Sequence, residues 1–423
     1  MKKLIGYEMK KVLKRPMVIG VLALVIIYNF LMIFYGTFPG EPTYGLKYSK
    51  QEVERIKEDR TEFAGYIDDD WIQNIKYQKE SILYDPANQI SDKEKEAKID
   101  ELVDRGFSRE EAESNIFFFV KEEVLESREL QRLEEPEVSG NFYHRADKKG
   151  NETAEYYRET YQGQKGEALA LKAEEMYGYL SNKHVVYYDY SWGWSRLHAM
   201  QTVLPYTIGV FLVVALSPIF SQEYWKKTDS LILTTKYGKN RIIAAKIIIS
   251  FVIAVSAWVF IQLINFIMIA VLFGLEGSKS FLQNWVQNPS PYPFTYLSSY
   301  FFVLAMSFLG LIFFVSTILL ISAKIKKTFT SLVVSGIVLL LPITFNWLLV
   351  DGIESADGIV SMVLLFSPSN VLIGVHHFKN FEAFYLFGNV VMLPIVIVVF
   401  SVISSILMLI YGYYSFKRYQ VEN

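Results

Sequence analysis

The chain has 423 residues, of which 52% are hydrophobic and 20% charged, and its formal net charge is −2. It contains no cysteine, which excludes a domain held together by disulfide bonds. This composition fits either a large soluble protein or a membrane protein, so the distribution of the apolar residues has to distinguish the two classes.

Six apolar stretches are long enough to cross a bilayer as helices, which takes about 20 residues each. They run from Met17 to Tyr35, Thr202 to Phe220, Ile247 to Leu275, Tyr296 to Ser322, Phe329 to Val350 and Phe387 to Phe416. The sequence therefore predicts an all-α membrane protein with six transmembrane helices, the first over residues 17–36 and the others within residues 200–416.

The first span is preceded by residues 1–16, in which six Lys and Arg surround a stripe of apolar side chains. This pattern predicts a helix in the membrane interface, although a basic tail that only orients the chain is the alternative. The first span is longer than the apolar core of a signal peptide, and no small-x-small cleavage pattern precedes residue 37. We therefore expect this span to be retained as an anchor.

Basic residues gather in the segments that would share one side of the membrane. Residues 1–16, 221–246, 323–328 and 417–423 carry six, six, three and two Lys or Arg. The two short loops on the opposite side carry only Lys279 and Lys379, against five acids. Because Lys and Arg are retained on the cytoplasmic side, both termini, including the tail 417–423, are predicted to be cytoplasmic at the inner or plasma membrane.

Residues 37–199 lie outside in this topology and carry 35 acidic against 23 basic residues. Ser49, Ser91 and Ser108 are each followed three residues later by Glu, a capping-box pattern that marks helix starts. A mainly helical extracytoplasmic domain is thus predicted between the first two spans. In it we expect one helix to end at Gly106, a longer one to begin at Ser108, and a loop over residues 135–151.

The last part of this domain is rich in aromatic residues just before the second span. They are Tyr187, Tyr188, Tyr190, Trp192 and Trp194. Aromatic residues at this position are typical of a belt at the membrane interface. A site for an aromatic or lipidic ligand is the alternative.

The sequence offers little evidence of catalysis. The stretch nearest to a nucleotide-binding loop, from Gly274 to Ser280, has the wrong spacing, and the five histidines form no metal-binding pattern. We therefore expect neither a metal site nor an enzyme active site.

The predicted span cores contain no charged residue, which disfavours ion-driven transport. Their neutral polar residues Gln262, Asn265 and Asn346 are expected to form interhelical hydrogen bonds rather than to bind substrate.

Residues 357–380 contain two short apolar pieces that are broken at Ser367 and Pro368. Each piece is too short to cross a bilayer. The segment is predicted to be a re-entrant or interfacial element on the outer side, or a buried cap over the transmembrane bundle.

The loop 221–246 between the second and third spans is amphipathic. A helix from Glu223 to Thr234 would place Tyr224, Trp225, Leu231 and Ile232 on one face and Lys226 and Lys227 on the other. Gly238 suits a helix C-cap, and Asn240 suits the N-cap of the next helix. Such a surface either lies in the membrane interface without a partner or docks into a groove of a soluble protein.

This loop resembles the first cytoplasmic loop of ABC-2 type permeases. Glu223, Leu231, Leu233, Gly238, Arg241 and Lys246 match the family pattern in order, whereas Asp229, Lys236 and Tyr237 depart from it. The six spans, the basic N-terminal helix, the large outer domain and the proline-broken outer element are also similar to the family's layout.

The resemblance implies a permease subunit that is not itself an enzyme and carries no cofactor. It implies a separate ATPase subunit in two copies that binds ATP and magnesium, a second permease that is identical or related, and export by alternating access across the bilayer. The exported molecule would be amphiphilic, such as a peptide, an antibiotic or a lipid, and no nucleic acid would take part. The alternative function is a membrane-anchored sensor whose outer domain binds a ligand.

Contact with the ATPase is expected through a coupling helix in this loop. The coupling residues implied by the resemblance are Glu223, Tyr224, Trp225, Lys226, Lys227, Leu231, Ile232, Leu233, Gly238, Arg241 and Lys246.

Overall fold

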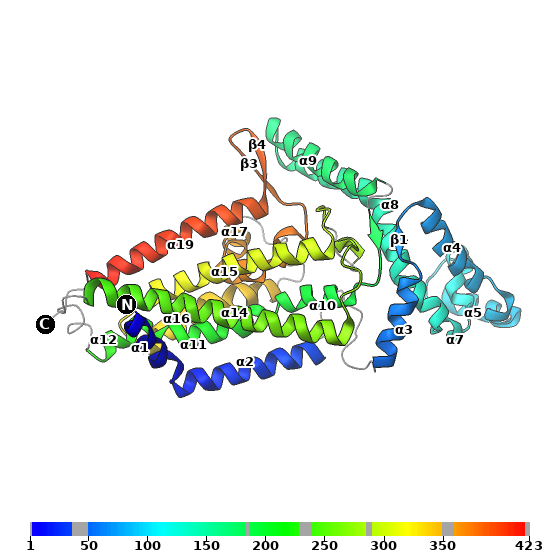
Figure 1. Cartoon of the computed structure of the whole chain (residues 1–423). Coiled ribbons are helices and arrows are strands. Elements are labelled where there is room, and N and C mark those ends of the chain that lie inside the picture. Colours follow the sequence, from blue (N-terminus) through cyan, green and yellow to red (C-terminus); the bar gives the residue numbers. More distant parts are fainter. Residues whose placement is uncertain are drawn as a thin grey trace. The chain divides into compact units, whose positions relative to one another are not determined.

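The computed structural model describes residues 2–35, 50–182, 186–227, 238–284, 290–348 and 359–418. Contacts divide the chain into two compact units (Figure 1). The membrane unit comprises Met1–Lys47, Trp192–Leu275 and Leu297–Asn423, and the inserted unit comprises Tyr48–Ser191 and Glu276–Tyr296. The segment between the third and fourth spans therefore belongs to the inserted unit, although its sequence indicates only a connecting loop.

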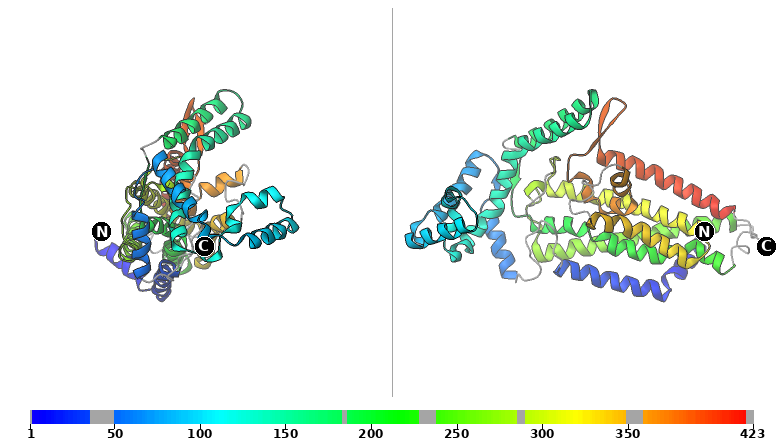
Figure 2. Two further views of the ribbon diagram at one scale, coloured as in Figure 1. Left: turned by 90° about the vertical axis from the view of Figure 1, so that its right-hand side faces the viewer. Right: turned by 180° about the vertical axis from the view of Figure 1, so that it is seen from behind.

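Among the described residues, six helical stretches are long and apolar enough to cross a membrane (Figure 2). They are Pro16–Phe34, Trp192–Trp225, Asn240–Phe273, Tyr296–Lys324, Thr328–Phe345 and Leu393–Lys417. The predicted fold class, an all-α membrane protein with six transmembrane helices, is confirmed.

The N-terminal helix and the first three spans comprise several helical elements. These are α1 (Lys2–Leu13), α2 (Pro16–Tyr35), α10 (Trp192–Gln201), the π-helical turn η3 (Pro205–Gly209), α11 (Val210–Leu216), α12 (Pro218–Trp225), the π-helical turn η4 (Gly238–Ile242) and α14 (Ile243–Phe273). The helical spans extend past the apolar windows of the sequence and include Glu223 and Lys246. The predicted span cores contain no charged residue, and these two charged side chains lie in the helical extensions beyond those cores.

Polar pairs join the first three spans inside the membrane unit. The Asn29 side-chain amide donates to Asn265 Oδ1 at 2.7 Å, and the Gln262 amide donates to Gln201 Oε1 at 2.9 Å. All four side chains are buried. The predicted interhelical role of Gln262 and Asn265 is confirmed, whereas the side chain of Asn346 lies outside the described residues.

The remaining elements of the membrane unit follow the third span. These are α15 (Tyr296–Lys324), α16 (Thr328–Leu348), α17 (Ile359–Leu365), α18 (Pro368–Ile373), the 3-10 turn η7 (Val375–Phe378), β3 (Ala383–Leu386), β4 (Asn389–Met392) and α19 (Leu393–Lys417). The predicted break at Ser367 is confirmed, since its side chain accepts from the Asn370 amide as an N-cap. The last span begins at Leu393 rather than Phe387, because residues 383–392 pair as a hairpin.

The short helix α18 is buried, and it packs against α15 at Gly310. A Cβ atom added to Gly310 would lie 2.4 Å from the backbone nitrogen of Leu372. Only glycine lets the two backbones approach this closely. The element after the fifth span is therefore held by a backbone contact inside the membrane unit.

The inserted unit is mainly helical. Its elements are α3 (Lys50–Thr61), β1 (Gly65–Tyr66), α4 (Asp69–Leu83), η1 (Pro86–Asn88), α5 (Asp92–Asp104), α6 (Arg109–Ser114), η2 (Ile116–Phe119), α7 (Glu122–Leu125), α8 (Arg128–Thr160), α9 (Gln164–Ser181), β2 (Tyr187–Tyr188) and η5 (Leu282–Asn284). The two short strands β1 and β2 pair in antiparallel register.

The predicted loop over residues 135–151 is wrong. This segment lies within the 33-residue helix α8, with Pro136 inside it. Leu133, Tyr143 and Ala146 are buried in the core that α8 shares with α4 and β2. The burial of this face outweighs the unfavourable local propensity of Pro and Gly, because tertiary packing supplies most of a helix's stability.

The single long helix predicted to begin at Ser108 is also wrong. Asn115 is extended, with φ −94° and ψ 98°, and its side chain caps η2, so α6 ends at Ser114. The break lets Phe119 and Val120 turn into two small apolar clusters. The predicted ending at Gly106 is confirmed, since Gly106 has φ +99° after α5.

Two of the three predicted capping boxes are confirmed. Ser91 and Ser108 each accept from the backbone amide three residues on, while Glu94 and Glu111 accept from the backbone amides of the two serines. Ser49 lies outside the described residues.

The predicted aromatic belt is wrong for Tyr188 and Tyr190, whereas Trp192 and Trp194 lie in α10 at the start of the second span. Tyr188 and Tyr190 are fully buried, and Tyr188 contacts Trp71 with ring centroids 5.4 Å apart. These rings form part of the inserted unit's own core. Burial and then the Glu135 carboxylate raise the pKa of Tyr188 well above its usual value, so it stays protonated.

The capping box at Ser108 gives a pH-dependent prediction. The backbone amide and then the hydroxyl of Ser108 lower the pKa of the Glu111 carboxyl. When folding lowers the pKa of a carboxyl group, the ionised group stabilises the folded state. This stabilisation is complete above the unfolded-state pKa of about 4.3, and it is lost as the pH falls through the folded-state pKa. We expect hydrogen exchange at the start of α6 to accelerate below about pH 4, beyond the intrinsic pH effect. If the Ser108→Ala variant showed the same acceleration, the capping box would not be its cause.

Candidate functional site

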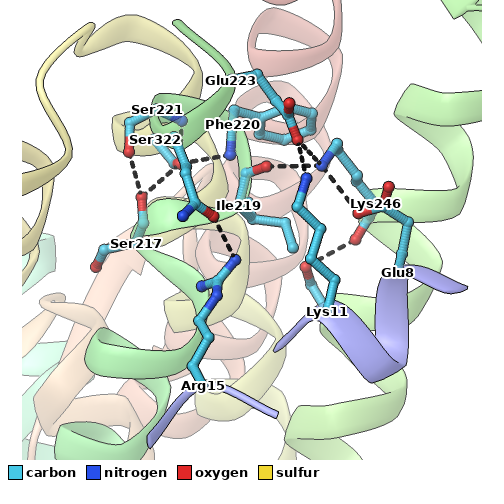
Figure 3. A network of polar contacts seen from close by, with 12 residues as sticks. Glu8, Lys11, Arg15, Ser217, Ile219, Phe220, Ser221, Glu223, Lys246 and Ser322 are labelled. Carbon is cyan, nitrogen blue, oxygen red and sulfur yellow. Dashed lines mark hydrogen bonds and ion pairs between the residues drawn. The ribbon is translucent and has the colours of Figure 1, made fainter. Parts of the chain in front are cut away.

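A buried ion cluster joins α1 to the second and third spans (Figure 3). Lys246 Nζ lies 3.0 Å from Glu8 Oε2, 2.9 Å from Glu223 Oε1 and 3.0 Å from the carbonyl oxygen of Ile219. The side chains of Lys246, Glu223 and Glu8 are only 1%, 4% and 6% exposed. One lysine thus satisfies two carboxylates that come from two other helices.

Two further cations from α1 and its C-terminal turn complete this cluster. Lys11 Nζ forms an ion pair with Glu223, and the Arg15 guanidinium donates to Gln222 Oε1 at 2.9 Å and to the carbonyl oxygen of Ala215 at 3.4 Å. Burial lowers the pKa of Arg15, while the carboxylates of Glu8 and Glu223 act in the opposite direction. Arginine remains charged in proteins, so three cations surround two carboxylates.

The spacing of these residues explains why α1 presents them together. Glu8, Lys11 and Arg15 recur at intervals of three and four residues, which places them on one side of a helix. Val12, next to them, is fully buried in the core of the membrane unit. α1 therefore packs against the bundle through one apolar and ionic face.

A serine network holds the opposite side of α12. Ser322 Oγ accepts from the amides of Phe220 and Ser221 at 3.0 and 3.2 Å, and it donates to the carbonyl oxygen of Ser217 at 2.6 Å. The amides of Phe220 and Ser221 need external partners because they lie in the first turn of α12, where backbone N–H groups have no intrahelical acceptor. Tyr224 Oη also donates to the carbonyl oxygen of Ala323 at 2.9 Å.

The two networks fasten α12 on two sides. The ion cluster binds it to α1 and α14, and the serine network binds it to α15. We call the end of the membrane unit that contains α1 and the C-terminal ends of α12, α15 and α19 the basic end. Tyr413 of α19 reaches Asn240 of η4 there, with the phenol oxygen 2.9 Å from Oδ1.

Comparison with protein families identifies the chain. A family model described as ABC-2 family transporter protein matches residues 3–421. The chain belongs to the ABC-2 transporter family. The match spans nearly the whole chain, including the inserted unit and all six spans, and it confirms the resemblance to this family. No curated protein and no solved structure matches the chain.

The ABC-2 permease is therefore a multi-pass membrane component of an ABC transporter. Family membership settles the class of protein and its place in a membrane. In the part of the chain that the structure describes, no group of three or more His, Asp or Glu side chains could hold a metal ion.

The structure separates the expected coupling residues of the ABC-2 permease into two groups. Glu223, Tyr224 and Lys246 are buried in the membrane unit, and Glu223 and Lys246 bind each other. Trp225, Lys226, Lys227 and Arg241 are exposed, with Trp225 69% accessible. Leu231, Ile232 and Leu233 lie outside the described residues, and Gly238 begins η4.

The helix expected from Glu223 to Thr234 is interrupted near its start, and residues 228–234 lie outside the described part of the chain. α12 ends at Trp225, and Lys227 has a φ of +53°. This left-handed conformation is unfavourable for a lysine and breaks the helical hydrogen-bond pattern. The predicted N-cap is also wrong, because Asn240 lies inside the π-helical turn η4.

Sequence reasoning missed Glu8, Lys11 and Arg15 as members of this site. One signal was present, since Glu8 is the only acid in a segment with six basic residues. An isolated acid of this kind indicates a specific cationic partner, but the sequence does not indicate which one.

Proposed function

We propose that this ABC-2 permease is the membrane subunit of an ATP-driven exporter and works with a separate ATPase. The ATPase would be present in two copies and would bind ATP and magnesium. A second permease, identical or related, would complete the path for an amphiphilic substrate. The basic end would face the cytoplasm of a cell with the protein in its inner or plasma membrane, which agrees with the retention of Lys and Arg on that side.

The buried cluster around Lys246 carries the proposal. Glu223 lies near the start of the loop that would contact the ATPase, and Lys246 lies at its end. Because Lys246 binds both Glu223 and Glu8, a force on the loop would act on α1, α12 and α14 together. Proteins transmit such movements through packed elements and ion-pair networks.

The exposed residues at the two ends of the loop suit a docking surface. Trp225 offers an exposed ring, and Lys226, Lys227 and Arg241 offer positive charge. Aromatic and arginine side chains are enriched among residues that dominate binding energy. The buried residues Glu223, Tyr224 and Lys246 would instead hold the loop in place. The alternative sensor function has no observation in its favour that would outweigh family membership.

Purification of the native complex tests this proposal. We expect the native permease to retain about one ATPase per permease chain. The double variant Leu231→Asp with Ile232→Asp should reduce this retention at least about tenfold, because it places charge at an apolar contact. The double variant Val138→Asp with Leu171→Asp is the control, since both side chains are exposed on the inserted unit. Recovery of the native permease without any ATPase would disprove the exporter assignment. Equal ATPase retention by the two double variants would disprove only the docking role of the loop.

A further inference from the structure

An apolar groove lies between α15 and α19 at the basic end of the membrane unit. Its volume is about 640 Å³. Along α19 its lining changes from Leu407, Met408 and Ile410 to Tyr411, Tyr414 and Arg418. One wall is thus hydrocarbon-like, and the part nearest the end of the helix is aromatic and basic.

The two helices touch beside this groove and leave its apolar wall uncovered. A Cβ atom on Gly412 would lie 3.4 Å from the Cα atom of Leu320, so α19 approaches α15 closely there. Leu407 and Ile410, on the same helix, remain 60% and 50% exposed. In a membrane protein, such a surface faces either lipid chains or another protein.

The cations at the end of the groove are held by aromatic groups. Lys324 Nζ lies 2.6 Å from Tyr411 Oη and 4.1 Å from the centroid of its ring, and Arg418 lies 5.2 Å from the ring centroid of Tyr414. Neither α15 nor α19 contains an Asp or Glu. Positive charge is therefore positioned beside an apolar groove with no carboxylate from either helix.

We propose that this groove binds an anionic phospholipid from the leaflet at the basic end. An acyl chain lies against Leu407 and Ile410, and the phosphate pairs with Lys324 and Arg418. Basic pockets between transmembrane helices have the chemistry that recognises anionic head groups, and interfacial tyrosines lie at the same depth. In the topology given under the proposed function, this is the inner leaflet.

A second identical permease fits the groove less well. Its surface would have to bring carboxylates to Lys324 and Arg418. Of the described acids at the basic end, Glu8 and Glu223 are both buried in the ion cluster with Lys246. An anionic lipid supplies the missing negative charge and the acyl chain together.

Native mass spectrometry of the purified full-length permease tests the proposal, with phosphatidylglycerol and phosphatidylcholine as probes. We expect the wild type to retain one phosphatidylglycerol molecule with about tenfold preference over phosphatidylcholine. The double variant Lys324→Gln with Arg418→Gln should lose that preference. Leu407→Trp should weaken retention of the lipid by filling the apolar wall. All three side chains are exposed, so the fold should tolerate these changes.

The control variant Lys226→Gln with Lys227→Gln removes two exposed charges from the same end, and its lipid preference should equal that of the wild type. The lipid site would be overturned if this control lost the preference as well, or if the wild type showed no preference. It would also be overturned if soluble glycerol phosphate competed as well as the lipid does.

Because the chain has no cysteine, Ile410→Cys provides a unique thiol. Efficient cross-linking of two such chains through this thiol would assign the groove to a second permease instead. This test does not depend on the ATPase, so its failure would leave the proposed function intact.

Discussion

Lys246→Met should lower the free energy of unfolding of the permease by about 3 to 5 kcal/mol. The substitution keeps the length of the side chain but leaves Glu8 buried without its ion-pair partner. Glu223 retains Lys11, so most of the loss is expected at Glu8. Denaturation of the purified protein in mixed micelles would measure the effect.

The second half of this experiment restores the balance of charge. Glu8→Gln combined with Lys246→Met removes one acid and one base, and we expect it to recover most of the lost stability, because neutral pairs avoid the cost of an unpaired buried charge. Lys226→Met is the matched control at an exposed lysine and should change stability by less than about 0.5 kcal/mol. If Lys246→Met were as stable as Lys226→Met, the buried pairing would be incorrect.

Gly310→Ala should cost about 1 to 3 kcal/mol, the range for overpacking a close contact. The added methyl group would lie 2.4 Å from the Leu372 nitrogen and 2.5 Å from its Cα atom. Both atoms belong to backbone, which cannot move aside as the end of a flexible side chain can. The helix α18 must therefore shift away from α15, and thermal unfolding of the variant should show the loss.

Gly336→Ala provides the matched control for this prediction. Gly336 lies in α16, and an added Cβ there would meet no atom within 4 Å. Because Ala is a better helix former than Gly, this variant should be neutral or stabilised by up to about 1 kcal/mol. Equal stability of the two variants would show that the contact between α15 and α18 is not as close as described.

The ion cluster also suggests how the permease would respond to its partner. Glu223 and Lys246 are two of the residues that match the family pattern, yet both are buried. In the proposed function these residues would act through their position, since Lys11 and Glu8 tie Glu223 and Lys246 to one helix, α1. Weakening the cluster should thus alter transmission of movement without removing any surface that a partner touches.

Several features of this protein could be derived from short stretches of its sequence. A helix that crosses a bilayer must satisfy its backbone internally and expose apolar side chains over its whole length, so the six spans are visible as local composition. The caps at Ser91 and Ser108 are equally local, because donor and acceptor are three residues apart. The match from Glu223 to Lys246 likewise indicated the family within one loop.

The contacts that define the candidate site depend on the tertiary structure. Lys246 and Glu8 are 238 positions apart, and many basic residues could have paired with that acid. Burial also decided that residues 135–151 form part of α8 and that Tyr188 lies in a core. Helix propensity differs by tenths of a kcal/mol among most residues, and costs about 1 kcal/mol for Gly and about 3 kcal/mol for Pro. Burial of each large side chain contributes about 1.5 to 3 kcal/mol, so several buried side chains together outweigh these local costs. The sequence by itself thus determined the membrane class and the family, while only packing between distant segments decided which charges meet.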